Sequence, residues 1–298
     1  IKGATKVTAK GGSTAAGIGS GNGSNGSTII NIEGGTITAE GGGKENGSCQ
    51  ASGAGIGSGG NALNKTTINI KGGEITATGG VSLDSRNHSD KWLSGAGIGS
   101  GSNVSGETEI NISGDSTIKS ASGGKYGGAG IGSGSYSGST PDNKKGAVTI
   151  NITDGTIEKA TGGGEYVPSS KRWYSGAGIG AALNAGTTTI NIKDNAHIVS
   201  ATGGKYGGAG IGSGSGDTKN DSKKGAVTIN ITDGTIEKAE GKDGGAGIGS
   251  GYYGRSSTVN ISGNAELKDV KGGNLAAGIG SGYDSGKVDV VIDGGTIN

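Results

Sequence analysis

Residues 54–59 read Ala-Gly-Ile-Gly-Ser-Gly, and residues 66–77 read Thr-Thr-Ile-Asn-Ile-Lys-Gly-Gly-Glu-Ile-Thr-Ala. The string Ala-Gly-Ile-Gly recurs eight times, 31 to 48 residues apart, with its isoleucine at positions 18, 56, 98, 131, 179, 211, 248 and 279. A recurring unit of this length is typical of solenoids, whose repeats bury their apolar sides against one another. The sequence therefore predicts about eight stacked turns, here called rungs, in a single domain spanning residues 1–298.

Each repeat holds three short segments in which apolar residues alternate with polar residues or glycine. The first is typified by Ile30-Asn31-Ile32, the second by Thr36-Ile37-Thr38 and the third by Gly-Ile-Gly. Gly-Gly or Asp-Gly between the first two segments favours a sharp turn. Three strands and three corners predict an all-β, parallel, three-sided β-solenoid, in which stacked isoleucines fill a narrow core and outward asparagines hydrogen-bond from rung to rung. Length varies at only two loop positions per rung, one after the second segment and one after Gly-Ser-Gly.

Composition excludes several classes of partner. Lys and Arg total 26 against 25 Asp and Glu, so no basic surface for nucleic acid is expected. The one cysteine, Cys49, has no partner for a disulfide within the chain. No run of about 18 apolar residues occurs, so no membrane insertion is expected. Because neither end carries a polar cap, we expect the chain to be a segment of a longer surface protein.

The third segment predicts a wall of bare backbone, because alternation would turn its glycines outward. The positions that represent this wall are Gly55, Gly57, Gly97, Gly99, Gly130 and Gly132. Glycine inside a strand often marks the close approach of another backbone or a ligand. Two interpretations follow: a docking face for a partner or a second copy, or a tight side that lies under covering loops. Residues 181–183, Ala-Ala-Leu, depart from the pattern and put the continuity of the wall in doubt there.

The aromatic residues all lie in the variable loops, so we expect none of them in the core. Six are predicted to form a row along one edge: Trp92, Tyr126, Tyr166, Trp173, Tyr174 and Tyr206. Aromatic rings offer faces to sugars and to cations, and neighbouring polar side chains supply hydrogen bonds. The row is therefore a candidate ligand-binding edge. The alternative is that the rings only fix long loops against the solenoid.

Residues for catalysis are sparse, and we expect no catalytic site, no metal site and no cofactor. His197 replaces a strand threonine and His88 lies in a loop, so both are interpreted as solvent-facing. The loop acids Asp142, Asp217 and Asp221 lack the spacing of a calcium loop and are interpreted as solvated charges.

The strings Gly-Ala-Gly-Ile-Gly-Ser-Gly and Thr-Ile-Asn-Ile-x-Gly-Gly-x-Ile-Thr-Ala resemble the glycine-rich β-helix repeats of large cell-surface proteins of Gram-positive gut and environmental bacteria. The resemblance covers nearly the whole chain. It implies a right-handed parallel β-helix in a secreted or cell-surface protein similar to adhesins and carbohydrate-binding β-helices. We expect a non-enzymatic extracellular module, an adhesin or stalk whose loop edge contacts a glycan or a host surface protein. The alternatives are a structural filament subunit that associates end to end or laterally, and a polysaccharide lyase or hydrolase on the same scaffold.

Overall fold

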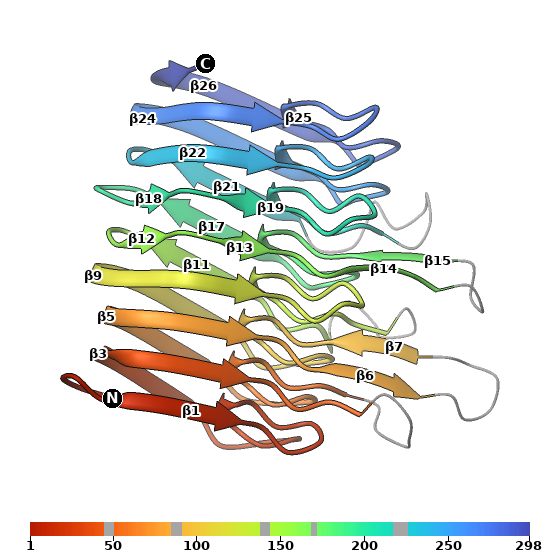
Figure 1. Ribbon diagram of the computed structural model, residues 1–298. Coiled ribbons are helices and arrows are strands. Elements are labelled where there is room, and N and C mark those ends of the chain that lie inside the picture. The colour runs from red at the N-terminus through yellow and green to blue at the C-terminus, as the bar shows by residue number, and fades with distance from the viewer. Residues whose placement is uncertain (45–50, 85–90, 138–143, 168–171, 217–225) are drawn as a thin grey trace.

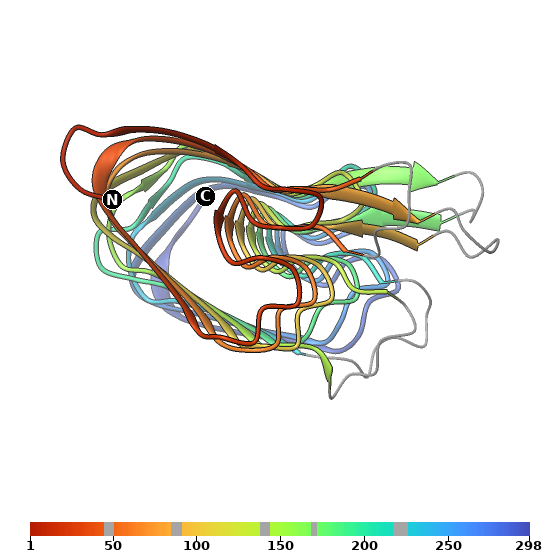
Figure 2. The same cartoon turned by 90° about the horizontal axis from the view of Figure 1, so that it is seen from below.

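The computed structural model describes residues 1–44, 51–84, 91–137, 144–167, 172–216 and 226–298. The rungs stack from the N-terminus to the C-terminus (Figure 1) and nearly superimpose when seen along the stack (Figure 2). Strands account for all the regular elements of these ranges. No helix in them is long and apolar enough to cross a membrane.

Two large parallel sheets and two small hairpins make up the fold. The eight-stranded sheet holds the Ile-Gly pairs β2 (Ile18–Gly19), β4 (Ile56–Gly57), β8 (Ile98–Gly99), β10 (Ile131–Gly132), β16 (Ile179–Gly180), β20 (Ile211–Gly212), β23 (Ile248–Gly249) and β25 (Ile279–Gly280). The 14-stranded sheet holds β1 (Lys6–Lys10), β3 (Thr28–Glu40), β5 (Thr66–Thr78), β9 (Thr108–Ser122), β11 (Val148–Ile152), β12 (Thr156–Ile157), β13 (Ala160–Thr161), β17 (Thr188–Ile192), β18 (His197–Ile198), β19 (Ala201–Thr202), β21 (Val227–Ile231), β22 (Thr235–Glu240), β24 (Ser257–Lys271) and β26 (Val288–Ile297).

The recurring isoleucines lie above one another in register, as the repeat predicts. In the third segment Ile18 pairs with Ile56 and Ile56 with Ile98, and the pairing continues to Ile279. The first and second segments show the same columns, for example Ile150 beside Ile190. These side chains form one continuous buried cluster. Apolar burial from rung to rung therefore holds the stack together.

The first and second segments of a rung belong to one sheet, which differs from the prediction of three separate strands. In β3 and β5 the backbone turns at Gly35 and Gly73, whose φ angles are +96° and +94°, and then resumes pairing. Only glycine adopts such angles without strain. The chain turns at these corners while both segments stay in the same sheet.

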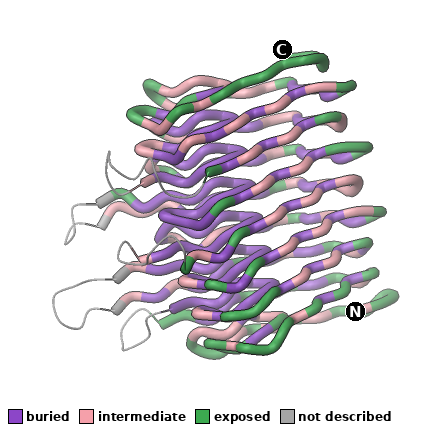
Figure 3. The backbone as a smooth tube through the Cα atoms, turned by 180° about the vertical axis from the view of Figure 1, so that it is seen from behind, coloured by how far each residue is buried: buried purple, intermediate pink, exposed green. Residues whose placement is uncertain are grey.

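The outward asparagines form a ladder along the first segment, where buried and half-buried residues alternate (Figure 3). The Nδ2 group of each asparagine donates to Oδ1 of the asparagine one rung before it. The bonds join Asn69 to Asn31, Asn111 to Asn69, Asn151 to Asn111, Asn191 to Asn151, Asn230 to Asn191 and Asn260 to Asn230, over 2.8 to 2.9 Å. The prediction of rung-to-rung hydrogen bonding is confirmed.

One aromatic residue belongs to the core, contrary to the prediction. Tyr136 packs in the main cluster with 1% of its surface exposed. Its hydroxyl donates to the carbonyl of Val104 and accepts from the amide of Gly146. The composition of the segment around Tyr136, rich in Gly and Ser, did not indicate these core contacts.

The glycine wall is not an outer face, and the docking interpretation is wrong. All six glycines that represent the wall are buried: Gly55, Gly57, Gly97, Gly99, Gly130 and Gly132. A Cβ on Gly55 would lie 2.8 Å from the backbone of Thr78, and one on Gly57 would lie 1.7 Å from the carbonyl oxygen of Gly99. Seen along the stack, the Ile-Gly strands run inside the outline of the rungs (Figure 2). Glycine permits this tight packing of backbone under the corner loops.

Candidate functional site

The long loops after the second segment fold into two antiparallel hairpins that project from the same side of the stack (Figure 1). One pairs β6 (Val81–Asp84) with β7 (Lys91–Ser94), and the other pairs β14 (Gly164–Val167) with β15 (Arg172–Ser175). Successive strand residues point to opposite faces. Trp173 is accordingly 43% exposed, whereas Tyr174 is only 6% exposed.

The inner faces of the hairpins meet in a small aromatic cluster against the solenoid. Tyr126, Tyr174 and Leu183 are buried there, and Val81 and Trp92 pack against them. The ring centroids of Trp92 and Tyr126 lie 4.4 Å apart. Tyr126 and Tyr174 of the predicted edge are therefore buried, which favours for these two residues the alternative that the rings fix the loops against the solenoid. Leu183, the departure from the repeat, fills this cluster.

The outer faces carry a second group of rings, which includes three of the predicted edge residues. The centroid of Trp173 lies 4.3 Å from that of Tyr166 and 4.4 Å from that of Tyr206. Tyr166 and Tyr206 are half-buried. The structure thus brings these residues together from two rungs, as expected from their places in the repeat.

Tyr252 and Tyr283, which are not among the predicted edge residues, extend this group of rings. Each stands four residues after the isoleucine of Gly-Ile-Gly, at Ile248 and Ile279, where the other rungs carry Asn, Gly, Ser or Leu. Their rings stack with centroids 5.4 Å apart and planes 8° apart. The repetition of tyrosine at this position in consecutive rungs was the signal that could have identified them.

Backbone hydrogen bonds join the two variable loops and set these rings beside the corner. The amide at the fourth position after the isoleucine donates to a glycine carbonyl in the corner of the preceding rung. The bonds run from Leu183 to Gly127 (3.0 Å), from Tyr252 to Gly207 (2.7 Å) and from Tyr283 to Gly244 (2.8 Å). A Cβ on Gly207 would lie 2.2 Å from Cβ of Tyr252. Glycine in the corner therefore leaves the space that the aromatic residue needs.

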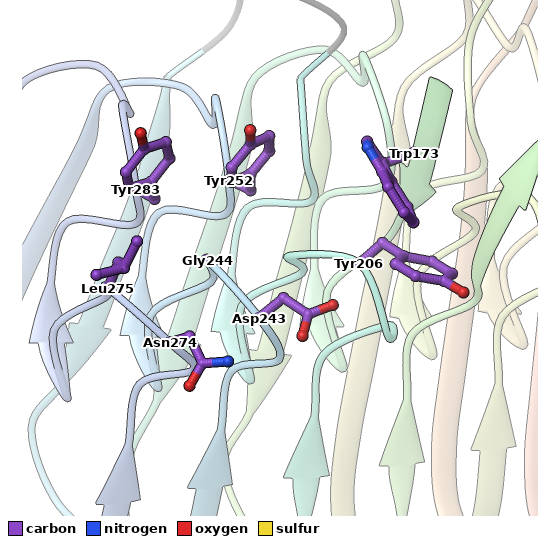
Figure 4. Close-up of a pocket in the computed structure, with 8 residues that line it drawn as sticks. All are labelled: Trp173, Tyr206, Asp243, Gly244, Tyr252, Asn274, Leu275 and Tyr283. Carbon is purple, nitrogen blue, oxygen red and sulfur yellow. The ribbon is translucent and has the colours of Figure 1, made fainter. Parts of the chain in front are cut away.

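Between the two loops lies a hollow of about 430 Å³, here called the aromatic groove. Its lining residues are Trp173, Tyr206, Asp243, Gly244, Tyr252, Asn274, Leu275 and Tyr283. Figure 4 shows Tyr252 and Tyr283 along one side, Asp243 and Asn274 along the other, and Trp173 with Tyr206 at one end. The groove extends over several rungs, since its residues come from consecutive repeats.

Unusual backbone conformations gather at the groove. Asp243 and Leu275 have φ angles of +45° and +64°, and Tyr253, whose ring contacts that of Tyr252, has a φ of +47°. At the position of Tyr253, four other rungs place asparagine or aspartate with positive φ, which these residues tolerate: Asn61, Asn103, Asn184 and Asp284. Leu275 is also 80% exposed. Strained and exposed residues of this kind are a recognised mark of functional sites.

The groove contains one carboxylate and a phenol with an altered pKa. Burial raises the pKa of Tyr252, and its hydrogen bond with Tyr253 raises it further. Asp243 is exposed, whereas the adjacent Lys242 forms an ion pair with Glu240 on its own rung.

Other candidate residues do not assemble into a site. His197 faces solvent on the second segment, 3.2 Å from Glu237. Asp154 lies at a corner beside a polar hollow and accepts a hydrogen bond from Asn195. Among the residues that the structure describes, no group of three or more His, Cys, Asp or Glu could hold a metal ion. Five residues considered from the sequence lie outside the described ranges: Cys49, His88, Asp142, Asp217 and Asp221.

A family model described as "Beta helix repeat" matches residues 1–22, 30–60, 68–102, 110–135, 150–182 and 229–252, which together make up more than half of the chain. No curated protein and no solved structure matches the chain.

Proposed function

The chain belongs to the beta helix repeat family, and from that premise we propose that it is a non-enzymatic module that binds polysaccharide along its aromatic groove. The observation that carries the proposal is the meeting of four aromatic rings from consecutive rungs over one open hollow. The finer architecture belongs to the same proposal: a right-handed, three-sided β-solenoid, in keeping with the strong preference for right-handed parallel crossovers. We also propose that the protein is extracellular, on a bacterial surface, where polysaccharide is accessible.

The aromatic rings supply the main contact surface. Trp173 is 43% and Tyr283 37% exposed, which is high for such large apolar groups in a chain with little apolar surface to bury. The faces of aromatic rings pack against the C–H groups of sugar rings, and their polar atoms reach the hydroxyl groups. A groove that combines several rings with few polar groups is typical of carbohydrate recognition.

The direction of the groove suits a linear polymer. Strands of neighbouring rungs are separated by about 4.8 Å, so side chains from three or four rungs present a row of regularly spaced contacts. Asp243 and Asn274, from consecutive rungs, provide hydrogen-bonding groups opposite the tyrosines. A polysaccharide lying along the solenoid axis would contact both rows at once.

The experiment uses the intrinsic fluorescence of the chain, which has two tryptophans. In the variant Trp92→Phe, Trp173 is the sole reporter. A panel of soluble polysaccharides is titrated into this variant, and retention in gels that contain each polymer is measured in parallel. We expect at least one neutral or amino-bearing polymer to shift the emission of Trp173 and to retard the protein.

The matched variants are Trp173→Ala and Tyr252→Ala, in the groove, and Val199→Ala, which is exposed on the second segment. Each groove variant should lose about tenfold or more in affinity, as expected for a central aromatic contact, whereas Val199→Ala should bind normally. Retention that survives both groove substitutions would reject the groove as the binding site. Release of new reducing ends during incubation would reject the non-enzymatic part of the proposal.

A further inference from the structure

We infer that the aromatic groove selects polysaccharides that carry free ammonium groups, with Asp243 as the counter-charge. This inference rests on the proposed function and names the class of sugar polymer. It begins from the corner column on which Asp243 lies. Tyr126 and Tyr206 occupy this column in earlier rungs, each directly after a lysine, and rung seven has Asp243 after Lys242.

In the earlier rungs the lysine covers the ring that follows it. The ammonium of Lys125 lies 4.9 Å from the ring centroid of Tyr126, and that of Lys205 lies 5.2 Å from the centroid of Tyr206. Rings on this edge thus already attract ammonium groups of the chain itself. In the described ranges, no lysine or arginine is placed in this way over Tyr252 or Tyr283.

The carboxylate of Asp243 is also unpaired. Lys242 bonds to Glu240, and Lys271, on the next rung, lies 2.9 Å from Asp269. Within the part of the chain that the structure describes, no cationic side chain forms an ion pair with Asp243. The exposed carboxylate of Asp243 therefore lies opposite the rings of Tyr252 and Tyr283. The nearby Lys242 and Lys271 are paired with other carboxylates.

This arrangement is complementary to an organic cation on a sugar. An ammonium group gains from the faces of aromatic rings and from a charge-assisted hydrogen bond to a carboxylate. A uronic acid at the same place would meet a like charge, which is unfavourable. Among linear sugar polymers, one built of amino sugars with free amines presents both a ring for stacking and a cation for Asp243.

The test compares three oligosaccharides of equal length: a β-linked glucosamine oligomer, its fully N-acetylated form and a neutral glucose oligomer. Affinity is measured by calorimetry and by the fluorescence of Trp173, at low and at moderate salt. The free-amine oligomer should bind about tenfold more tightly than the other two. Its advantage should shrink as salt screens the charges.

The decisive variant is Asp243→Asn, because asparagine also tolerates the left-handed conformation at φ +45°. It should bring the affinity for the free-amine oligomer down to that for the acetylated oligomer measured with the same variant, so the ratio of these two affinities is the readout. The control is Asp194→Asn, which has a φ of +57° and lies between β17 and β18, not among the residues that line the groove. It should leave the preference intact.

The outcomes separate the two claims. Equal affinity for the free-amine and acetylated oligomers, unaffected by Asp243→Asn, would overturn the inference and leave polysaccharide binding in place. Loss of the preference in Asp194→Asn as well as in Asp243→Asn would also overturn it, since a general charge effect would then explain the selectivity. Failure of all three oligomers and of the wider panel to bind would overturn the proposed function, and the inference with it.

Discussion

The rings of Tyr252 and Tyr283 lie parallel, one rung apart, with planes 8° apart and centroids separated by 5.4 Å. Both rest on the backbone of Gly244. The amide of Tyr283 donates to the carbonyl of Gly244 over 2.8 Å, and a Cβ at Gly244 would lie 2.5 Å from Cδ2 of Tyr252. The ring pair therefore depends on the absence of a side chain at this one position.

Gly244→Ala should displace the tyrosine pair without unfolding the chain. The φ of Gly244 is not in the left-handed region, so alanine is compatible with its backbone, and the conflict falls on the rings. We expect a changed near-ultraviolet circular dichroism spectrum and about tenfold weaker polysaccharide binding. Gly12→Ala, in open space, is the matched control. An unaltered spectrum and affinity in Gly244→Ala would contradict this account of the ring pair.

Gly99→Ala should destabilise the solenoid strongly. The φ of Gly99 is +138°, and a Cβ there would lie 1.8 Å from the carbonyl oxygen of Gly132 on the next rung. Backbone strain and the broken contact together should lower the free energy of unfolding by more than about 3 kcal/mol. Urea denaturation measures the change. Gly26→Ala, which meets no neighbouring atom, should stay within about 0.5 kcal/mol of the parent.

The asparagine ladder predicts a difference between its middle and its end. Asn151 makes two ladder bonds, one to Asn111 and one with Asn191, whereas Asn31 makes only one. Valine suits a strand and occurs at this position in the last rung, as Val291. Asn151→Val should cost about 1 to 2 kcal/mol of unfolding free energy, and Asn31→Val about half as much. Equal costs by urea denaturation would show that the ladder bonds contribute little.

The ion pairs on the second segment predict loss of stability in acid. A hydrogen bond from Lys268, over 3.0 Å, holds the pKa of Glu237 below its ordinary value, and His197 contacts the same carboxylate. A carboxyl group whose pKa is lower in the folded state contributes stability above its unfolded pKa and loses it as the pH falls through the folded value.

Glu237→Gln should therefore lower the Tm at neutral pH, and the difference from the parent should shrink as the pH falls below the ordinary glutamate range. Thermal unfolding between neutral and acidic pH measures both chains. Asp115→Asn, an exposed substitution at a corner, is the control and should show no such convergence. A constant difference at every pH would rule out this carboxylate as the source.

Much of the fold could be predicted because each rung repeats the same local pattern. The columns at Ile56 and Ile150 follow from alternation and a fixed repeat, and Asn151 follows as their outward neighbour. The prediction that the glycines form a bare outer wall is wrong. Alternation predicts that Gly57 points away from Ile56, but it could not reveal that the backbone of Gly99 occupies the space that a side chain at Gly57 would need.

The candidate site could be predicted only in part, because it combines two loops. Trp173 and Tyr206 are predictable because they belong to the same variable loop of the repeat. Tyr252 and Tyr283 belong to the other loop, and no local pattern indicates that the two loops meet. The hairpin β14–β15 also escaped prediction, although its alternation decides that Trp173 faces outward and Tyr174 inward.

The sequence by itself determined the rungs, their register and the aliphatic core, because recurring isoleucines stack when successive rungs pair in register. Only the tertiary structure decided which surfaces are open. Exposure depends on what lies beside a residue in space, and for Gly57 and Tyr174 that neighbour comes from another rung or loop. The aromatic groove exists for the same reason: corner glycines leave room for tyrosines of the following rung, a relation that no single repeat contains.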